Sequence, residues 1–300
     1  MTTNANDGRF RLADGRTVAF AEYGDAQGTP VVFFQGTPSS RLMHPPEDIT
    51  RELNARLILV DRPGFGGSDV APGRTLLDWP SDIAPLLEHL GVGAFAIAGI
   101  SGGGPYALAT AYCLPDRVRA VSVCGGSGPL ELPGALRGAA PVRRAGYLLA
   151  RHAPRLFRWF LRHTTHPSKQ AEKFIRRYTR HNPPADQAII ADPAFHEMYL
   201  ANFAEAARQG FDAFADEVIL ASKPWGFDLR DIAVPVHIWQ GALDTSTPSA
   251  MAKGMAARIP AATLSVLPGE GHMFIYGPLW RAVLSELLSV RRCEEGSRRA

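Results

Sequence analysis

The sequence predicts an α/β fold in which helices cover both faces of a mostly parallel sheet. Short apolar runs that are typical of strands alternate with helical patterns along the chain. The alternation stops between residues 127 and 226, where the strand signal disappears. A chain of 300 residues that is 46% hydrophobic and 20% charged can bury one large core with a smaller attachment.

The chain opens with β-structure. Two extended runs flank an Asp-Gly pair within residues 10–23 and predict a hairpin. The apolar runs 30–34 (PVVFF) and 56–61 (RLILVD) predict two buried strands, and a glycine-rich turn ends the second. Residues 76–90 predict a helix, because leucine and isoleucine recur there at helical spacing.

Later elements continue the alternation and bring the predicted strands to eight. Further strands are expected over 95–99, 118–124, 234–240 and 262–267, and helices from about Gly104 and over 276–290. The segment that interrupts them is rich in arginine, aromatic residues and proline and has helical character. We therefore expect a core of residues 1–126 and 227–300, with a helical cap of residues 127–226 inserted after the sixth strand.

Charge is distributed unevenly along the chain. The formal net charge is only +3, yet residues 137–181 hold twelve arginines or lysines and one acid, Glu172. This asymmetry indicates a separate structural unit with its own surface. No phosphate loop, dinucleotide fingerprint or aromatic-interleaved basic stretch appears, so we expect neither a nucleic-acid partner nor a cofactor.

The cysteines and the apolar runs bear on the cellular compartment. Cys113, Cys124 and Cys293 are odd in number, unevenly spaced and close to no histidine pair, which argues against a disulfide framework and against a metal site. The first residues are polar, and no run reaches the roughly 18 apolar residues that span a bilayer. We therefore expect a soluble, cytoplasmic protein, and the sequence leaves its oligomeric state open.

A glycine-rich serine motif marks the junction between the predicted strand 95–99 and the next helix. Residues 99–104 read GISGGG, a G-x-S-x-G pattern that permits a sharp turn lifting Ser101 above the sheet edge. Backbone N–H groups at the helix start, beginning with Gly102, point to the same space and can stabilise an oxyanion. The alternative is a glycine turn whose serine only caps a helix. The strand before the motif and the helix after it favour the catalytic interpretation.

A serine nucleophile needs a base and a residue that orients the base. Asp244 follows the predicted strand 234–240, and His272 follows the strand 262–267 in a glycine-rich loop. Because parallel strands end at one edge of a sheet, we expect Ser101, Asp244 and His272 to converge. Taken alone, Asp244 fits a turn or helix cap, and His272 fits a structural role. Their positions at three strand ends, in the order serine, aspartate, histidine, favour a catalytic triad.

Five segments resemble the α/β-hydrolase fold superfamily, and most closely its capped bacterial serine hydrolases of the esterase type. They are FFQGTPSSR, DRPGFGGSD, GISGGGPYALA, WQGALD and GEGH. The resemblance implies that superfamily's eight-stranded sheet and a second oxyanion N–H from Thr37, with Gly36 as the neighbouring candidate. Gln35 stands where the family usually has histidine, and it can donate and accept hydrogen bonds in a similar place. DRPGFGGSD is expected mainly to shape a turn beside the site rather than to supply catalytic carboxylates.

The identity of the nucleophile narrows the chemistry. Relatives that open epoxides or displace halide use aspartate at the elbow, because their intermediate is an alkyl ester of the enzyme, so Ser101 argues against both reactions. Serine with His272 and an oxyanion hole fits attack at a carbonyl, and we expect hydrolysis of a small-molecule ester above that of a thioester, amide or activated carbon–carbon bond. Lyase or oxygenase chemistry and a ligand-receptor role remain alternatives, because fold alone does not determine function.

The cap is expected to decide the substrate. Arg151, Arg155, Arg158 and Arg162 recur at helical spacing beside leucines and aromatic residues, so residues 151–163 predict a basic amphipathic helix. Such a helix fits attraction of anionic or amphiphilic acyl substrates, weak contact with an acidic membrane surface, or a solvated basic face, of which the last is the commonest. Aromatic residues of the cap either line an apolar pocket or pack between cap and core.

Overall fold

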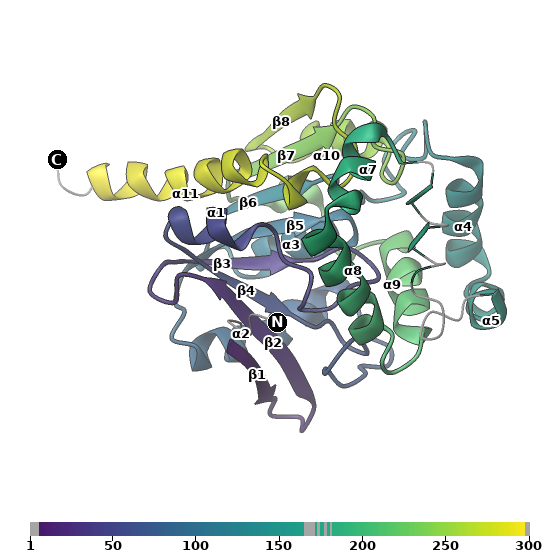
Figure 1. Ribbon diagram of the computed structural model, residues 1–300, viewed down its shortest axis with the longest axis horizontal. Coiled ribbons are helices and arrows are strands. Elements are labelled where there is room, and N and C mark those ends of the chain that lie inside the picture. The colour runs from purple at the N-terminus through teal and green to yellow at the C-terminus, as the bar shows by residue number, and fades with distance from the viewer. Residues whose placement is uncertain (1–5, 165–171, 173–174, 177–178, 181, 298–300) are drawn as a thin grey trace.

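An eight-stranded sheet forms the centre of the computed structural model, which describes residues 6–164, 172, 175–176, 179–180 and 182–297 (Figure 1). Its strand order is β1-β2-β4-β3-β5-β6-β7-β8. β2 is antiparallel to both neighbours, and the other pairs are parallel. The strands are β1 (Asn6–Arg11), β2 (Thr17–Gly24), β3 (Thr29–Phe34), β4 (Ala55–Val60), β5 (Phe95–Ile100), β6 (Val118–Cys124), β7 (Val236–Gly241) and β8 (Ala262–Leu267). The predicted fold class is confirmed.

Helices cover both faces of the sheet (Figure 1). One face carries α1 (Glu47–Glu52) and α11 (Trp280–Ser297), and the other carries α2 (Trp79–His89), α3 (Gly104–Cys113) and α10 (Ser249–Ala256). The helix predicted over 76–90 begins with a 3-10 turn, η1 (Leu76–Asp78). The last helix begins later than predicted, because the 3-10 turn η5 (Phe274–Tyr276) and a Gly-Pro pair precede it.

Side chains on the central strands alternate between the two faces. On β3, Val32 and Phe34 belong to the core beneath α2, α3 and α10, whereas Val31 and Phe33 belong to the core beneath α1 and α11. All four side chains are fully buried, as expected of a strand that is covered on both sides. Each contributes about 1.5–3 kcal/mol to the stability of the fold. The strand ends, and the residues that follow them, are therefore held on a rigid support.

Between β6 and β7, the described residues contain helices and no strand. We call these the cap helices: α4 (Pro141–His152), α5 (Pro154–Thr164), α7 (Pro184–Ala191), α8 (Pro193–Ala206) and α9 (Asp212–Ser222). Residues 127–140 form turns, because glycine and proline recur there. The helix predicted over 151–163 corresponds to α5 but begins later: residues 151–152 belong to α4, and Pro154, which has no N–H to continue α4, begins α5.

The cap helices lie beside the carboxyl ends of the parallel strands. α9 contacts the 3-10 turn η2 (Ser101–Gly103) after β5, and α7 contacts η5 after β8. In Figure 1 the cap helices stand together to the right of the sheet. Of the basic segment 137–181, residues 165–171, 173–174, 177–178 and 181 lie outside the described residues. Within the described part of the chain, every helix is too short or too polar to cross a membrane.

Candidate active site

Ser101 lies on a strained turn at the end of β5. Its φ is +55°, in the left-handed region that residues other than glycine rarely adopt. The turn also brings two backbones close together, because a Cβ at Gly103 would lie 2.0 Å from the carbonyl oxygen of Phe34. Only glycine fits that approach. The strand, turn and helix thus place Ser101 at the carboxyl edge of the sheet, at the position typical of a nucleophile elbow.

Asp244 and His272 meet at the same edge. His272 Nδ1 lies 2.8 Å from Asp244 Oδ2, in a hydrogen bond between the loops that follow β7 and β8. The Asp244 side chain is fully buried, and that of His272 is 11% exposed. Because a carboxylate only accepts hydrogen bonds, Nδ1 carries the proton and Nε2 keeps a lone pair that can act as a base.

Asp244 caps a turn as well as pairing with His272. Its Oδ1 accepts hydrogen bonds from the backbone N–H groups of Ser246 and Thr247, at 2.6 and 3.0 Å, and its Oδ2 accepts one from the Thr247 hydroxyl at 2.7 Å. Burial alone raises the pKa of Asp244, but the His272 imidazole and the Thr247 hydrogen bonds outweigh it, and the pKa is lowered. The carboxylate therefore stays ionised and keeps the imidazole oriented.

The loop after β6 contacts both Ser101 and the Asp244–His272 pair. The Ser127 N–H donates to the Ser101 carbonyl at 2.9 Å. A Cβ at Gly125 would lie 2.9 Å from Asp244 Oδ2 and 3.1 Å from His272 Nδ1. The three predicted residues thus lie around the same loop, the one that follows β6. Among the described residues no hydrogen bond joins the Ser101 hydroxyl to His272, as is common in unliganded sites.

Thr37 and Gly102 face each other beside Ser101. A Cβ at Gly102 would lie 2.3 Å from the Thr37 hydroxyl oxygen and 3.5 Å from its backbone nitrogen. A Cβ at Gly36 would lie 3.3 Å from Ser101 Cβ. These close approaches place the backbone of Gly36 and Thr37 beside Ser101 and Gly102, and the absence of a side chain at Gly36 and Gly102 makes room for the contact.

Arg62 orients the loop that carries Thr37. Its guanidinium is buried and donates to the Gln35 carbonyl at 2.6 Å and to the Gly36 carbonyl at 2.8 Å. The C=O and N–H of a trans peptide point in opposite directions. Holding the Gly36 carbonyl therefore fixes the direction of the Thr37 N–H. The Gln35 amide donates to the Val60 carbonyl at 3.0 Å, which ties the same loop to β4.

Glu217 of α9 neutralises Arg62 from the cap side. Its Oε2 accepts from Arg62 Nε at 2.9 Å and from the Thr37 hydroxyl at 3.2 Å. Its Oε1 accepts from Arg74 Nη2 at 2.6 Å and from the Tyr106 hydroxyl at 2.5 Å. Burial raises the pKa of Glu217, but Arg62 and Arg74 outweigh burial and the pKa is lowered. A buried ion pair thus joins a cap helix to the loop that carries Thr37.

Asp186 of α7 makes a second link between the cap helices and the site. Its carboxylate accepts the backbone N–H groups of His272 and Met273, at 2.9 and 2.8 Å. A Cβ at Gly271 would lie 2.4 Å from this carboxylate, so glycine is needed there. Burial raises the pKa of Asp186, although the two backbone hydrogen bonds act in the opposite direction. α7 therefore holds the loop that carries His272.

Sequence motifs did not indicate Arg62, Asp186 or Glu217 as parts of the site. A signal for Arg62 was present, because it lies in DRPGFGGSD directly after a predicted strand and at the same sheet edge as the other candidates. Asp61 of that motif, by contrast, accepts hydrogen bonds from Arg41 and from the Gly67 N–H of the turn. Asp186 binds the backbone of His272, 86 positions away, and Glu217 binds Arg62, 155 positions away. No sequence motif in the helical segment marks either carboxylate.

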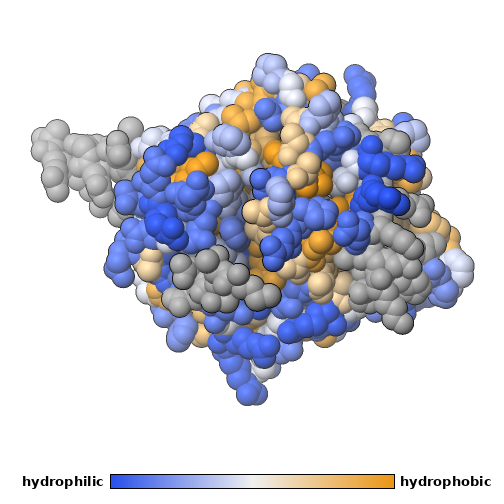
Figure 2. Space-filling view, in the orientation of Figure 1, coloured by the Kyte–Doolittle hydropathy of each residue, from blue (hydrophilic) through white to orange (hydrophobic). Residues whose placement is uncertain are grey.

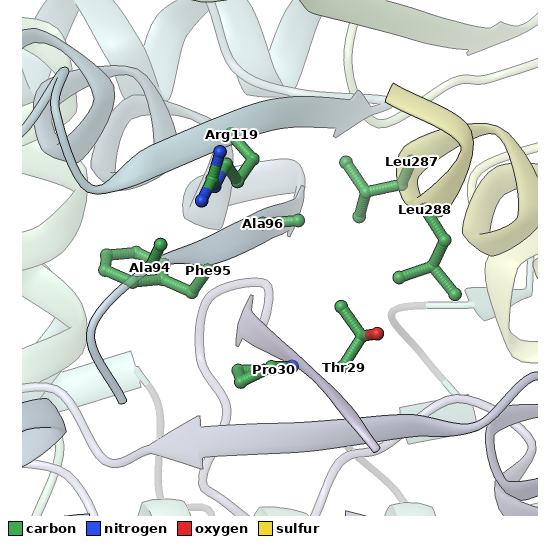
Figure 3. A pocket seen from close by; sticks show the side chains of 8 residues that line it. All are labelled: Thr29, Pro30, Ala94, Phe95, Ala96, Arg119, Leu287 and Leu288. Carbon is green, nitrogen blue, oxygen red and sulfur yellow. The ribbon is translucent and has the colours of Figure 1, made fainter. Parts of the chain in front are cut away.

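Two cavities lie away from Ser101. One cavity, of about 60 Å³, opens at the amino-terminal end of the sheet, among Thr29, Ala96, Arg119 and Leu287 (Figure 3). A cavity of this volume has room for only a few water molecules. The other, of about 240 Å³, lies between α7 and η5 and is apolar apart from Glu270. In the part of the chain that the structure describes, no group of histidine, cysteine, aspartate and glutamate could hold a metal ion.

Comparison with known sequences finds a family model and individual proteins that are similar to this chain. The model of the alpha/beta hydrolase family matches residues 31–282. A non-heme chloroperoxidase from Streptomyces lividans is 26% identical over 287 residues, covering 88% of this chain and 92% of that protein. A proline iminopeptidase from Neisseria gonorrhoeae is 27% identical over 123 residues, and that match spans only 40% of each protein.

Solved structures share the fold over nearly the whole chain. An enol-lactonase from Burkholderia xenovorans LB400 superposes with a TM-score of 0.69 at 16% identity, covering 94% of this chain and 100% of its own. An esterase from Rhodococcus sp. ECU1013 gives 0.65 at 21% identity, covering 95% and 98%. A thermophilic esterase from Thermogutta terrifontis gives 0.63 at 25% identity, covering 97% and 99%.

Proposed function

The chain belongs to the alpha/beta hydrolase family, and from this premise we propose that it is a serine hydrolase that acts through an acyl-enzyme. Its substrate is a carboxylic ester of small or medium size and hydrophobic character. Ser101 is the nucleophile, His272 the base and Asp244 the residue that orients the base. One observation carries the proposal: the buried Asp244–His272 pair lies at the same sheet edge as a serine held at φ +55°.

The mechanism begins with attack of Ser101 Oγ on the ester carbonyl while His272 Nε2 takes the hydroxyl proton. The carbonyl electron pair moves to oxygen, and the N–H groups of Thr37 and Gly102 stabilise that oxyanion. Collapse of this intermediate expels the alcohol, which receives the proton from His272. Water then attacks the acyl-enzyme with His272 again as base, the carboxylic acid leaves, and Ser101 regains its proton.

The charges beside the site favour an uncharged acyl substrate. A substrate with a free ammonium group needs an unpaired carboxylate to replace the water that it loses. The buried carboxylates described here already have partners: Asp244 pairs with His272, Asp186 with two backbone N–H groups, and Glu217 with two arginines. We therefore place ester hydrolysis above the iminopeptidase activity of the partial relative.

Hydrolysis assays with p-nitrophenyl acetate, butyrate and octanoate, run beside proline p-nitroanilide, test the proposal. We expect the wild type to hydrolyse the esters and to react with a fluorophosphonate probe. Ser101→Ala should lose labelling and at least about 10³-fold in kcat, because the nucleophile is gone. Ser127→Ala is the matched control, since it removes a neighbouring hydroxyl and keeps the backbone N–H that bonds to Ser101.

Three outcomes would count against the proposal. Ester turnover that survives in Ser101→Ala would remove Ser101 as nucleophile. Preference for proline p-nitroanilide over every ester would overturn the substrate class. Labelling of Ser101 without turnover of any ester would keep the nucleophile and reject ester hydrolysis.

A further inference from the structure

An exposed apolar stripe runs along α5. Leu156, Trp159 and Phe160 stand at positions i, i+3 and i+4 of this helix, which share one face, and they are 52%, 56% and 48% exposed. On the adjoining α4, Val142 and Leu148 are 78% and 40% exposed. Five of the eight large hydrophobic residues that are exposed in the described part of the chain thus belong to these two helices.

The helix α5 packs on α9 by a different face from the stripe. Phe157 and Leu161 of α5 form a small core with Ala215 and Ile219 of α9. Arg158 and Arg162 reach α9 as well, with ion pairs to Asp216 and Asp212 of 2.7 and 2.6 Å. Leu156 and Trp159 lie outside this small core and are about half exposed, and exposed apolar side chains that gather on one face mark an interaction surface.

The charge of the same two helices has one sign. Residues 141–164 contain six arginines and no acidic residue. Arg144 of α4 and Arg155 of α5 are exposed. Helices that lie in the interface of an anionic lipid layer typically combine large aromatic and aliphatic side chains with arginines.

We propose that α4 and α5 form a docking surface for an anionic lipid membrane, with the stripe inserted among the acyl chains and the arginines at the headgroups. The position of the helices fits this partner, because they lie at the right-hand edge of the molecule in Figure 1, on the side of the cap helices that faces away from the sheet. Figure 2 shows hydrophobic and hydrophilic residues side by side at this outer edge.

Vesicle binding followed by tryptophan fluorescence provides the test. Trp159 is the exposed tryptophan, since the other four of the chain are 8% exposed or less. We expect a blue shift and cosedimentation with vesicles of phosphatidylglycerol and phosphatidylcholine, and neither with phosphatidylcholine alone. Raising NaCl to about 0.5 M should weaken binding, because added salt shortens the screening length. Ser101→Ala should bind like the wild type, which separates docking from hydrolysis.

Matched variants locate the surface. Arg155→Gln should lower the partition coefficient about fivefold, the effect of one arginine near an anionic layer, whereas Arg230→Gln on the core should not change it. Trp159→Ala should bind at least about tenfold more weakly, whereas Val70→Ala, which truncates an exposed valine elsewhere, should bind normally. Equal binding to neutral vesicles, no binding to either kind, or a dimer in solution that Trp159→Ala abolishes would each overturn the proposal.

Discussion

The conformation of the loop that carries Thr37 depends on one guanidinium, that of Arg62. Its planar fork reaches two carbonyls of the loop and a carboxylate of α9 at the same time, a geometry that a single ammonium cannot reproduce. Because Arg62 and Glu217 are buried, water cannot easily replace a lost hydrogen bond. The direction of the Thr37 N–H therefore rests on the shape of this side chain.

Arg62→Lys tests this role at the scale of one residue. We expect kcat to fall about 10–100-fold while KM changes by less than about threefold, because the loop stabilises charge that develops only in the transition state. Arg117→Lys is the control, since Arg117 also donates to two backbone carbonyls, those of Gly93 and Val92, far from the site. Equal losses in the two variants, or a change in KM alone, would contradict the role.

At the scale of elements, His272 is held from two sides. The helix α7 binds the backbone of its loop through Asp186. The loop after β6 passes so close to the Asp244–His272 hydrogen bond that a Cβ at position 125 would not fit, and Gly125 occupies that position. The loops after β7 and β8 therefore do not determine the position of the imidazole by themselves. The helix α7 and the loop after β6 also contribute to it.

Gly125→Ala should therefore separate the histidine from its aspartate. Gly125 has φ +49°, and the new Cβ would lie within 3.1 Å of both partners. We expect kcat to fall at least about 100-fold because the imidazole loses its orientation, and the melting temperature to fall by a few degrees because of backbone strain. Gly93→Ala, whose Cβ meets no atom within 4 Å, serves as the control. Wild-type kcat in a stable Gly125→Ala variant would show that the pair tolerates the intrusion.

At the scale of the whole molecule, the Glu217 ion pairs connect the cap helices to the core. Breaking such a buried pair from one side leaves an uncompensated charge and costs about 3–5 kcal/mol. The pKa of Glu217 is lowered from the ordinary 4.5 in the folded protein. Its contribution to the free energy of unfolding is therefore complete above about pH 4.5 and is lost as the pH falls through the folded pKa.

Urea unfolding at pH 7, 5 and 3 measures this contribution, because only the lowest pH lies well below the ordinary pKa of 4.5. We expect Glu217→Gln to lose about 3–5 kcal/mol at pH 7, and the difference from the wild type to shrink as the pH falls through the folded pKa, because the wild-type carboxylate then becomes protonated too. Glu88→Gln is the control, since its carboxylate is 69% exposed and its pair with Arg117 contributes less than about 1 kcal/mol. A difference that stays constant over this pH range would contradict the assignment.

The core was predictable because its strands are covered on both faces and read as short apolar runs between turn residues. Ser101, Asp244 and His272 could be named because each follows such a strand. The cap helices were harder: prolines, rather than apolar periodicity, set their boundaries, as Pro154 does between α4 and α5. Asp186 and Glu217 could not be identified, because their roles depend on partners supplied by tertiary packing.

The two carboxylate links have a consequence for protein engineering. Asp186 and Glu217 belong to different cap helices, and they hold the loops of opposite ends of the chain, around His272 and Thr37. The cap is therefore not an interchangeable module. A chimera that receives the cap of a relative would need both carboxylates at matching positions, and a version with the cap deleted would lose the support of the loops that carry Thr37 and His272.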